Sequence, residues 1–508
     1  MKQIKTYDVV VIGSGLGGLV SALLLAQEGK KVCVLEKNNQ YGGNLQTFVR
    51  DKTIFDTGVH YIGGLNKEEN LGKYFSYLNI LDQLQLEQLD QDCFDVIHFE
   101  NDAVGYPQAQ GYQNFVTQLL TYFPDEEQAL KKYIDAIQYY CNQFPLYNLE
   151  KGFGYNEEIM QHSVEMVLNS ITQNKKLQAV LIGNGFLSAL NYETTPFYVH
   201  ALTVNSYIQS AWRCVKGGSQ ITKAFVNELR KHNASLYKHQ KVVKLNFQET
   251  TLKSCETTDC IYEAQQFVSA IDLQQLFAMF NDTNKAKPYI KRISKLQNGP
   301  SVFSVHLVLK PETIRYFNHN LYHFNRVEDA FSHTGNFQEN KPKMLVITTN
   351  AHQQKQVHAR SISVMTYMDY DQVKKWEHSF NTVRNERNRG AEYHQFKDAI
   401  VANVLDSLET YFPDIKEQIQ SVHTSSPLSY RDYIGTTDGT MYGFEKEASQ
   451  PLKTLISPKT KVHNLYLTGQ NVRLHGILGV TITGFLTVGE MLGKDSFFDK
   501  VFKKINHA

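Results

Sequence analysis

The opening of the chain alternates apolar runs with short polar breaks, in the order of a strand, a helix and a second strand. Residues 8–12 form a β-branched apolar run that is typical of a buried parallel strand. An uncharged, largely apolar stretch follows and predicts a helix that ends at Gly29. Residues 32–36 predict a second buried strand. This order indicates an α/β fold that begins with a Rossmann-type unit.

Glycines fill the turn between the first strand and the helix at a spacing that suits a dinucleotide. Gly13, Gly15 and Gly18 match G-x-G-x-x-G, which permits a tight turn, a close approach to a pyrophosphate and close packing of helix on strand. Glu36 ends the second strand, where a carboxylate can accept hydrogen bonds from a ribose. The segment therefore predicts an adenine-dinucleotide site. We assign three neighbours to the same site: Leu16, Gly17 and Lys37.

The apolar start of the chain also raises the alternative of a signal peptide or a membrane anchor. Lys2 and Lys5 precede the apolar run, as basic residues do in such signals. Asp8 at the strand edge, the three spaced glycines and the lack of a small-residue cleavage pattern argue against this alternative. We therefore expect a cytoplasmic protein and leave open whether it contacts a membrane peripherally.

Two long insertions separate the elements of the dinucleotide unit. The first, about residues 102–211, has a helical pattern, and in residues 125–141 one helical face collects Leu130, Tyr133, Ile134, Ile137 and Tyr140. The second, about residues 299–454, has alternating strand patterns at 301–309, 344–349 and 361–368 and a helical pattern at 397–411. We predict a discontinuous cofactor domain (residues 1–101, 212–298 and 455–508). The remaining residues, 102–211 and 299–454, are expected to form a substrate domain with a mixed sheet and helices.

Composition narrows the classes of function. The 508 residues carry a net charge of +1 with both signs interspersed, so we expect no nucleic-acid partner. The six cysteines form no C-x-x-C motif and show no ligand spacing with histidine, so we expect reduced thiols and no metal site. The chain holds 29 Tyr and 29 Phe against 2 Trp, and we expect part of this aromatic stock to line an apolar tunnel.

Two motifs after Glu36 favour FAD over NAD. Residues 41–47 contain the pair Gly42–Gly43 followed by Asn44, and residues 55–61 read Phe-Asp-Thr-Gly-Val-His-Tyr. A glycine pair here lets the backbone pass the pyrophosphate a second time, which suits a long cofactor bound in extended form. With these residues the chain resembles the group of flavin-dependent amine oxidases, phytoene desaturases and carotenoid isomerases. Within that group it is most similar to the retinol saturase-like flavoproteins.

Further segments extend the resemblance over nearly the whole chain. Residues 212–219 resemble the group's internal double-glycine segment, and a strand is expected at residues 241–245, where the resemblance implies that Val242 touches the adenine. Residues 464–480 resemble the C-terminal flavin motif. The uncharged run 476–489 is expected to form a helix whose N-terminus faces the flavin. The resemblance also assigns these residues to the cofactor: Gly42, Gly43, Asn44, His60, Tyr61, Gly469, Gln470, Asn471, Gly479 and Val480.

The chain departs from the group's pattern at two of these positions. Asn44 stands where many members have Arg, and Asn471 stands where the C-terminal motif usually has an acid. An Asn side chain can donate and accept hydrogen bonds, so we expect non-covalent FAD binding to survive both changes.

Residues 179–186 offer an alternative site for a second nucleotide. The segment has two glycines, Gly183 and Gly185, but it lacks a third glycine and a following strand with a terminal acid. We interpret it as a helix end packed under the substrate cavity, and we expect no dedicated nicotinamide domain.

The resemblance implies an enzyme that adds two hydrogens across one double bond of a lipophilic polyene. Six side chains expected near the flavin ring are candidate proton donors: His60, Tyr61, His475, Tyr430, Arg431 and Tyr433. A structural role is the alternative for both histidines and for Tyr430 and Tyr433, and a bound water is also left open. The rival functions are a carotenoid-type isomerase, a desaturase, and a non-enzymatic prenyl- or lipid-binding escort protein of the same fold. The substrate, the electron donor and the oligomeric state stay open at this point.

Overall fold

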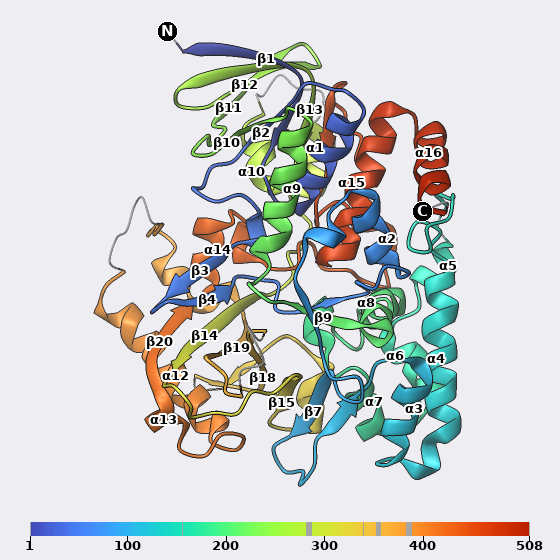
Figure 1. Cartoon of the computed structure of the whole chain (residues 1–508), viewed down its shortest axis with the longest axis vertical. Coiled ribbons are helices and arrows are strands. Elements are labelled where there is room, and N and C mark those ends of the chain that lie inside the picture. The colour runs from blue at the N-terminus through green and yellow to red at the C-terminus, as the bar shows by residue number, and fades with distance from the viewer. Residues whose placement is uncertain are drawn as a thin grey trace.

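The computed structural model describes residues 2–154, 156–280, 287–338, 340–351, 357–382 and 389–506. Two large sheets dominate the molecule, one near each end of its long axis, and a group of helices lies beside the second sheet (Figure 1). The N-terminus lies on the first sheet, and the C-terminus lies near the helical side (Figure 1).

The first sheet is built from three separate parts of the chain. Its parallel part has the order β10-β2-β1-β13, and β21 pairs with the end of β13. These strands are β1 (Gln3–Ile12), β2 (Val32–Leu35), β10 (Ser235–Tyr237), β13 (Cys260–Ser269) and β21 (Leu465–Leu467). An antiparallel pair, β11 (Lys244–Gln248) and β12 (Thr251–Glu256), extends the sheet beyond the first half of β13. The end of β1 and all of β2 are buried, because both faces of the sheet are covered at this point.

Three helices pack together against this sheet. They are α1 (Leu16–Gln27), α9 (Ser219–Lys231) and α15 (Gly476–Leu492), and α1 contacts both of the others. Gly484 allows α15 to approach α1 closely, because a Cβ at this position would lie 2.5 Å from Cγ1 of Val20. The first helix and the last long helix are therefore neighbours although they lie at opposite ends of the chain.

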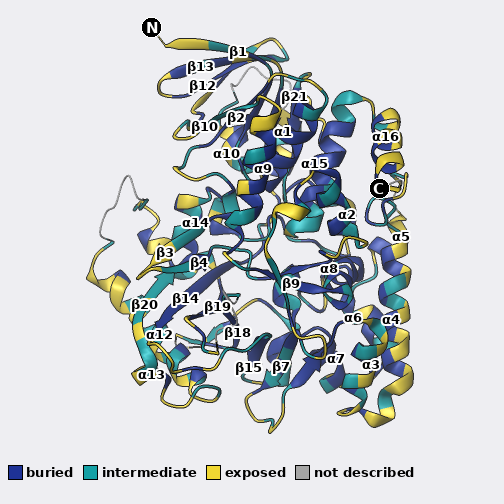
Figure 2. Cartoon of the chain, in the orientation of Figure 1, coloured by how far each residue is buried: buried dark blue, intermediate teal, exposed yellow. Residues whose placement is uncertain are grey.

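The second sheet is mixed and has the order β20-β14-β19-β18-β15-β7-β8. Only β15 and β7 are parallel neighbours in it; the other pairs are antiparallel. The strands are β7 (Asp95–Phe99), β8 (Tyr106–Gln108), β14 (Ser301–Leu309), β15 (Asn320–Phe324), β18 (Met344–Thr349), β19 (Ser361–Met368) and β20 (Ile419–Ser425). Its central strands are buried along their whole length (Figure 2).

Helices cover the flanks of the second sheet. One group comes from the first insertion: α3 (Tyr112–Leu120), α4 (Glu127–Asn142), α5 (Glu157–Met160), α6 (Val164–Ile171), α7 (Lys175–Leu181) and α8 (Phe197–Gln209). The other group comes from the second insertion: α12 (Ala391–Leu408), α13 (Ile415–Gln418) and α14 (Pro427–Tyr433). The apolar face predicted for α4 is confirmed, since all five of its side chains are buried.

Smaller elements complete the fold. The strands are β3 (Thr47–Arg50), β4 (Thr53–Asp56), β5 (Ile62–Gly63), β6 (Leu86–Gln88), β9 (Ala211–Cys214), β16 (Phe337–Gln338) and β17 (Lys341–Pro342). The helices are α2 (Asn70–Tyr77), α10 (Leu273–Ala278), α11 (Lys287–Ile293) and α16 (Lys494–Asn506). β9 pairs with β5 and β6 in a small three-stranded sheet.

The predicted α/β class with a Rossmann-type unit and a mixed-sheet partner is confirmed, with two corrections to the detail. β7 belongs to the second sheet although it precedes residue 102, because it pairs with β15 in parallel. The strand expected at 241–245 begins only at Lys244, and Val242, which precedes it, is buried. The place of β7 could not be read from alternation alone, because it depends on a partner distant in sequence.

Candidate functional site

A cavity of about 580 Å³ runs between the first sheet and the second. Its walls come from the loops after β1 and β2, from the N-terminus of α15, and from β15, β18 and β19. The volume falls in the range of about 300–1,000 Å³ that small-molecule and cofactor pockets occupy. Of the predicted cofactor residues, these line it: Gly13, Gly15, Leu16, Gly17, Glu36, Lys37, Gly42, Gly43, Asn44, His60, Tyr61, Val242, Gly469, Gln470, Asn471 and Val480.

Glu36 holds the glycine turn in place at one end of this cavity. Its Oε2 accepts hydrogen bonds from the backbone N–H and the hydroxyl of Ser14, and its Oε1 accepts from the backbone N–H of Asn38 at 2.8 Å. Lys37 lies beside it, and burial lowers the pKa of its ammonium group to about 8. A carboxylate has about four lone-pair sites, so Glu36 keeps capacity for a ligand hydroxyl.

The glycine turn leaves room at one position and allows close contact at another. A Cβ on Gly15 would meet no described atom within 4 Å, so this position faces open space in the cavity. A Cβ on Gly17 would instead lie 2.8 Å from the backbone nitrogen of Gly469, which brings the N-terminal and C-terminal motifs into contact. Since α1 starts here without a side-chain cap, its first N–H groups are available to an anion such as a diphosphate.

The N-terminus of a second helix opens onto the same cavity. His475 is the N-cap of α15, makes no side-chain capping bond, and lines the cavity together with Gly476 and Ile477. The helix has 17 residues, and its dipole favours negative charge at this end. The N-terminus of α15 therefore borders the cavity, and its expected position against the flavin stays a prediction.

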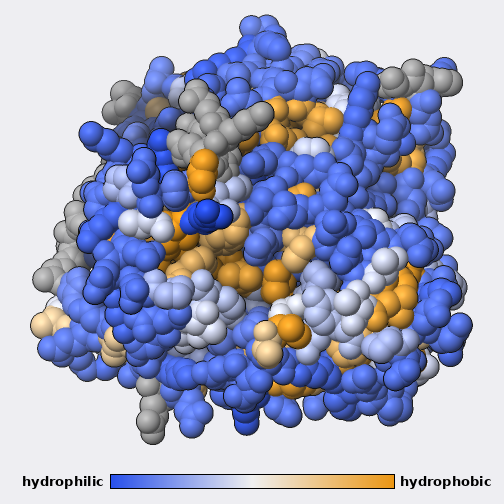
Figure 3. Space-filling view, turned by 60° about the horizontal axis from the view of Figure 1, so that its bottom comes forward, coloured by the Kyte–Doolittle hydropathy of each residue, from blue (hydrophilic) through white to orange (hydrophobic). Residues whose placement is uncertain are grey.

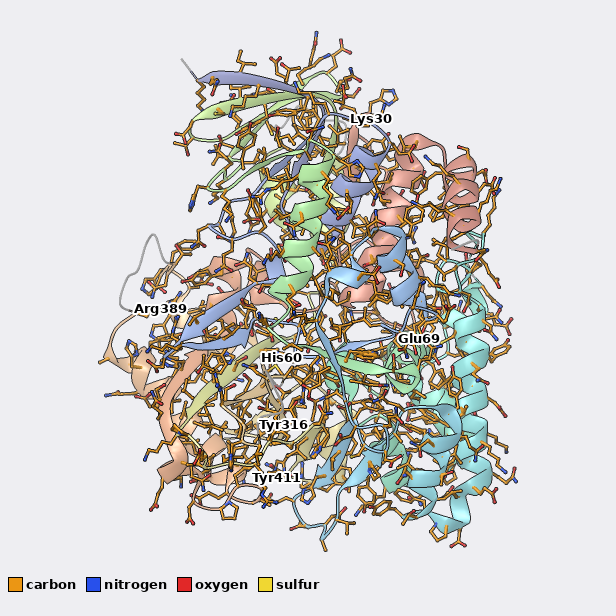
Figure 4. All side chains as sticks on the ribbon, in the orientation of Figure 1. Lys30, His60, Glu69, Tyr316, Arg389 and Tyr411 are labelled. Carbon is orange, nitrogen blue, oxygen red and sulfur yellow. The ribbon has the colours of Figure 1, made fainter. Side chains whose placement is uncertain are left out.

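Four buried polar atoms in the cavity wall have no hydrogen-bond partner within the part of the chain that the structure describes. They are Oδ1 of Asn44, Nε2 of His60, Oγ1 of Thr436 and Oδ1 of Asn471. A buried polar atom without a hydrogen bond costs free energy of folding. The position of these atoms therefore indicates a polar ligand that would complete their hydrogen bonds. His60 lies near the middle of the molecule, between the two sheets (Figure 4).

Both candidate histidines are neutral at physiological pH. Burial lowers the pKa of His60 to about 4, and the charge of Arg213 acts in the same direction. Burial also lowers the pKa of His475 to about 4, and Nε2 of this side chain lies 3.1 Å from the backbone oxygen of Leu187. Neither side chain is therefore the imidazolium ion, the acidic form of histidine, near neutrality.

The far wall of the cavity is aromatic and apolar. It is formed by side chains from β15, β18 and β19, from the segment after α7 and from the segment after α14: Phe186, Leu187, Tyr322, Val346, Met365, Met441 and Tyr442. Phe186 and Leu187 follow α7, so the interpretation of residues 179–186 as a helix end near the cavity is confirmed. A flat, lipophilic ligand suits this wall.

A second cavity of about 200 Å³ adjoins the first. The two share Leu187, Tyr207, His475, Gly476 and Ile477, and the second extends between α8, α15 and the loop around residue 153. Most of its other lining is apolar, for example Leu146, Leu202 and Ile482. Apolar groups gather near the middle of one face of the molecule, and further apolar patches lie toward its edges (Figure 3).

Three predicted site residues lie elsewhere. Gly18 packs the helix on the strand, because a Cβ there would lie 2.2 Å from the carbonyl oxygen of Gly13. Gly479 lines the second cavity, and a Cβ at this position would lie 2.9 Å from Cβ of Leu474. Tyr430 is buried outside both cavities, and its hydroxyl lies 3.2 Å from Oγ of Ser304.

Sequence reasoning missed Ser14 and the wall contributed by the second sheet. Ser14 stands inside the glycine motif, and its role follows from that position once the contact with Glu36 is known. No local sequence pattern marks the wall residues Tyr322, Val346 and Met365 as part of a site. Alternation of apolar and polar residues predicts a strand, but it does not predict which cavity the strand borders.

The comparisons with known proteins fit this geometry. The family model described as flavin containing amine oxidoreductase matches residues 16–369. The chain belongs to this family. An all-trans-retinol 13,14-reductase from Danio rerio is 26% identical over 96% of this chain and 86% of its own. A chloroplastic prolycopene isomerase 2 from an Oncidium hybrid cultivar is 22% identical over 96% of this chain and 84% of its own.

The fold is shared with solved members of the flavin-containing amine oxidoreductase group. A cyclohexylamine oxidase from Brevibacterium oxydans superposes with a TM-score of 0.60 at 13% identity, covering 98% of this chain and 99% of that one. With the family match, the prediction of FAD as the cofactor is confirmed. Within the described residues, no helix is long and apolar enough to cross a bilayer. In the same residues no cluster of three His, Cys, Asp or Glu side chains is placed to hold a metal ion.

Proposed function

We propose that this flavoprotein is an oxidoreductase that acts on a carbon–carbon double bond of a lipophilic polyene, of the retinol or carotenoid kind. The observation that carries the proposal is the shape of the site. A polar, glycine-lined half that suits a dinucleotide continues into an aromatic and apolar half that suits a conjugated chain. Relatives named as a retinol reductase and a prolycopene isomerase match almost the whole chain and support the same substrate class.

Different residues around the cavity would bind different parts of FAD. Glu36 would bind the adenosine ribose, Gly15 and the N-terminus of α1 would receive the diphosphate, and the N-terminus of α15 would face the flavin ring. Asn44 and Asn471 would satisfy their unpaired oxygens on donors of the cofactor. When bound, the flavin supplies or accepts the hydride.

The chain itself must hold the polyene beside the ring and keep water away from it. The aromatic wall does the first, since Phe186, Tyr322 and Tyr442 offer flat surfaces to a conjugated chain. The adjoining apolar cavity takes the rest of the lipophilic molecule. Burial of these side chains excludes water, which strengthens every hydrogen bond made inside the site.

Mass analysis of the product tests the proposal. The purified yellow protein is incubated anaerobically with dithionite and with retinol or a carotenoid. A product two hydrogens heavier supports a reductase. An unchanged mass with altered double-bond geometry points to the isomerase, and loss of two hydrogens with the oxidised protein points to the desaturase. No change in any polyene, or a protein that purifies without flavin, would overturn the proposal and favour the lipid-binding escort protein.

The apolar cavity offers a second, structural test. Leu202→Trp fills part of it from α8 without touching the dinucleotide half. We expect unchanged flavin content and a higher KM that worsens as the polyene lengthens. An unaltered preference for chain length would remove this cavity from the substrate site.

The source of electrons is a further part of the proposal. The chain carries one dinucleotide fingerprint, and residues 179–186 form a helix end, not a second nucleotide turn. We therefore expect NADPH alone to reduce the flavin slowly. Rapid bleaching of the flavin absorbance by NADPH in a stopped-flow experiment would contradict this expectation.

A further inference from the structure

A chain of hydrogen bonds links a buried carboxyl group to the aromatic wall of the cavity. The hydroxyl of Tyr61 lies 2.8 Å from Oδ2 of Asp95 and 2.6 Å from the hydroxyl of Tyr322. Tyr61 and Tyr322 both line the cavity, whereas Asp95 is fully buried behind them on β7. The two strands that carry Asp95 and Tyr322 are the parallel neighbours β7 and β15, so the backbone fixes their spacing.

The surroundings of Asp95 hold the carboxyl group in one orientation. Nδ2 of Asn320 donates to Oδ1 at 2.8 Å, and Arg213 donates to Oδ1 of Asn320, also at 2.8 Å. Burial raises the pKa of Asp95 to about 7, while these hydrogen bonds and the charge of Arg213 pull it down. The titratable or charged groups that face it are Tyr61, Cys93, Tyr207, Arg213 and Tyr322. Burial therefore favours the protonated carboxyl group of Asp95 near neutral pH, whereas it favours the neutral imidazole of His60 and His475.

We propose that Tyr322 donates the proton to the polyene and that Tyr61 and Asp95 resupply it. This inference rests on the proposed function. It departs from the expectation that His60, His475 or Tyr430 is the donor. Tyr322 is the catalytic residue in this scheme, because it lines the apolar wall of the cavity together with Val346, its partner on β18. Asp95 acts through the two tyrosines.

The step balances within the chain of groups. Reduction adds a hydride to one carbon of the double bond, and the other carbon then takes the proton of the Tyr322 hydroxyl. The Tyr61 hydroxyl proton moves to Tyr322, and the proton of the Asp95 carboxyl group moves to Tyr61. Asp95 ends as a carboxylate and regains a proton from solvent before the next turnover. The two electrons come from the external reductant of the flavin, which is dithionite in the experiments below.

Removal of single hydroxyls tests the relay. Tyr322→Phe keeps the ring and deletes the donor, so polyene reduction should slow by about 10²–10⁴-fold. Oxidation of the reduced flavin by ferricyanide needs no proton on carbon and should stay at the wild-type rate. The matched control is Tyr133→Phe, which removes an equally buried hydroxyl that lies 2.8 Å from Nε2 of His200, away from the cavity. It should leave both rates unchanged.

The pH profile tests the carboxyl group separately. In wild type the rate of reduction should fall as the pH rises through about 7, because Asp95 then loses the proton that it must supply. Asp95→Asn should abolish this fall and lower the rate at acidic pH. Infrared difference spectra without substrate should show a protonated carboxyl band that disappears over the same pH interval and is missing from Asp95→Asn.

The outcomes separate the relay from the function on which it rests. Wild type that leaves every polyene unchanged overturns the proposed function, whatever the variants do. Wild type that reduces a polyene, together with Tyr322→Phe at the wild-type rate, overturns the relay alone. A protein that shows no titrating carboxyl band overturns the role of Asp95, with or without a substrate.

Discussion

Removing the carboxylate of Glu36 should weaken flavin binding and destabilise the flavin-free protein by separable amounts. The side chain is 5% exposed and accepts from three donors, two on Ser14 and one on Asn38. Glu36→Ala leaves these donors without their acceptor in a buried turn. It also deletes the group that we propose binds the ribose.

The structure gives a size for each effect. A net hydrogen bond to a charged group contributes about 1.5–3 kcal/mol, and the three contacts share one carboxylate, so the apoprotein should lose about 2–5 kcal/mol of unfolding free energy. Unpaired ribose hydroxyls should cost a further 1–3 kcal/mol, which corresponds to a roughly 5- to 150-fold higher Kd for FAD.

Two assays read the two effects. Flavin fluorescence after serial dilution reports dissociation of FAD, and urea unfolding of the flavin-free protein reports stability. Glu228→Ala is the matched control, since Glu228 is also buried and accepts from Lys231 and Gln83 but lies outside the cavity. The control should lose stability and keep its affinity for FAD. If Glu36→Ala retained FAD through dilution as well as wild type, the ribose site would lie elsewhere.

Three further predictions concern a close helix contact, a buried carboxyl group and a buried histidine. Gly484→Ala should lower the unfolding free energy by about 1–3 kcal/mol, because the new Cβ would press on Val20, whereas Gly154→Ala meets no atom within 4 Å and should change little in thermal melts. Burial raises the pKa of Asp56 to about 7, so the folded state keeps a proton that the unfolded chain loses. The contribution of Asp56 to the free energy of unfolding is therefore largest at acidic pH. It declines by about 3–4 kcal/mol as the pH rises from about 4 to 7. Asp56→Asn should flatten that decline in urea titrations, and an unchanged slope would contradict the assignment. His60→Ala should lower flavin occupancy and leave the pH dependence of the rate per flavin near neutrality unaltered, because its imidazole is neutral there; loss of that dependence would return His60 to the role of proton donor.

The local sequence pattern predicted the dinucleotide half of the site. Gly13, Gly15 and Glu36 lie within one strand–helix–strand unit, so their spacing in the sequence nearly dictates their spacing in space. The amphipathic face of α4 was predictable for the same reason, since a helix repeats over a few residues. The apolar helix α15 was also predictable, because its uncharged run begins inside the C-terminal motif.

The catalytic half depended on contacts that no local pattern encodes. Tyr61 and Tyr322 are 261 residues apart in the chain, and their hydroxyls lie 2.6 Å apart only in the folded protein. Asp95 joins them because β7 pairs with β15 in the second sheet. The same pairing buries Asp95, and burial is what moves its pKa toward neutrality. Burial lowers the pKa of His60 and His475, the two histidines that the motifs suggested, because loss of water disfavours the charged imidazolium. The sequence by itself determined which cofactor the chain binds and where the binding unit begins, because those residues act through local backbone geometry. Only the tertiary structure decided which side chains face the substrate and which of them hold a proton, because both depend on distant strands and on the water that they exclude.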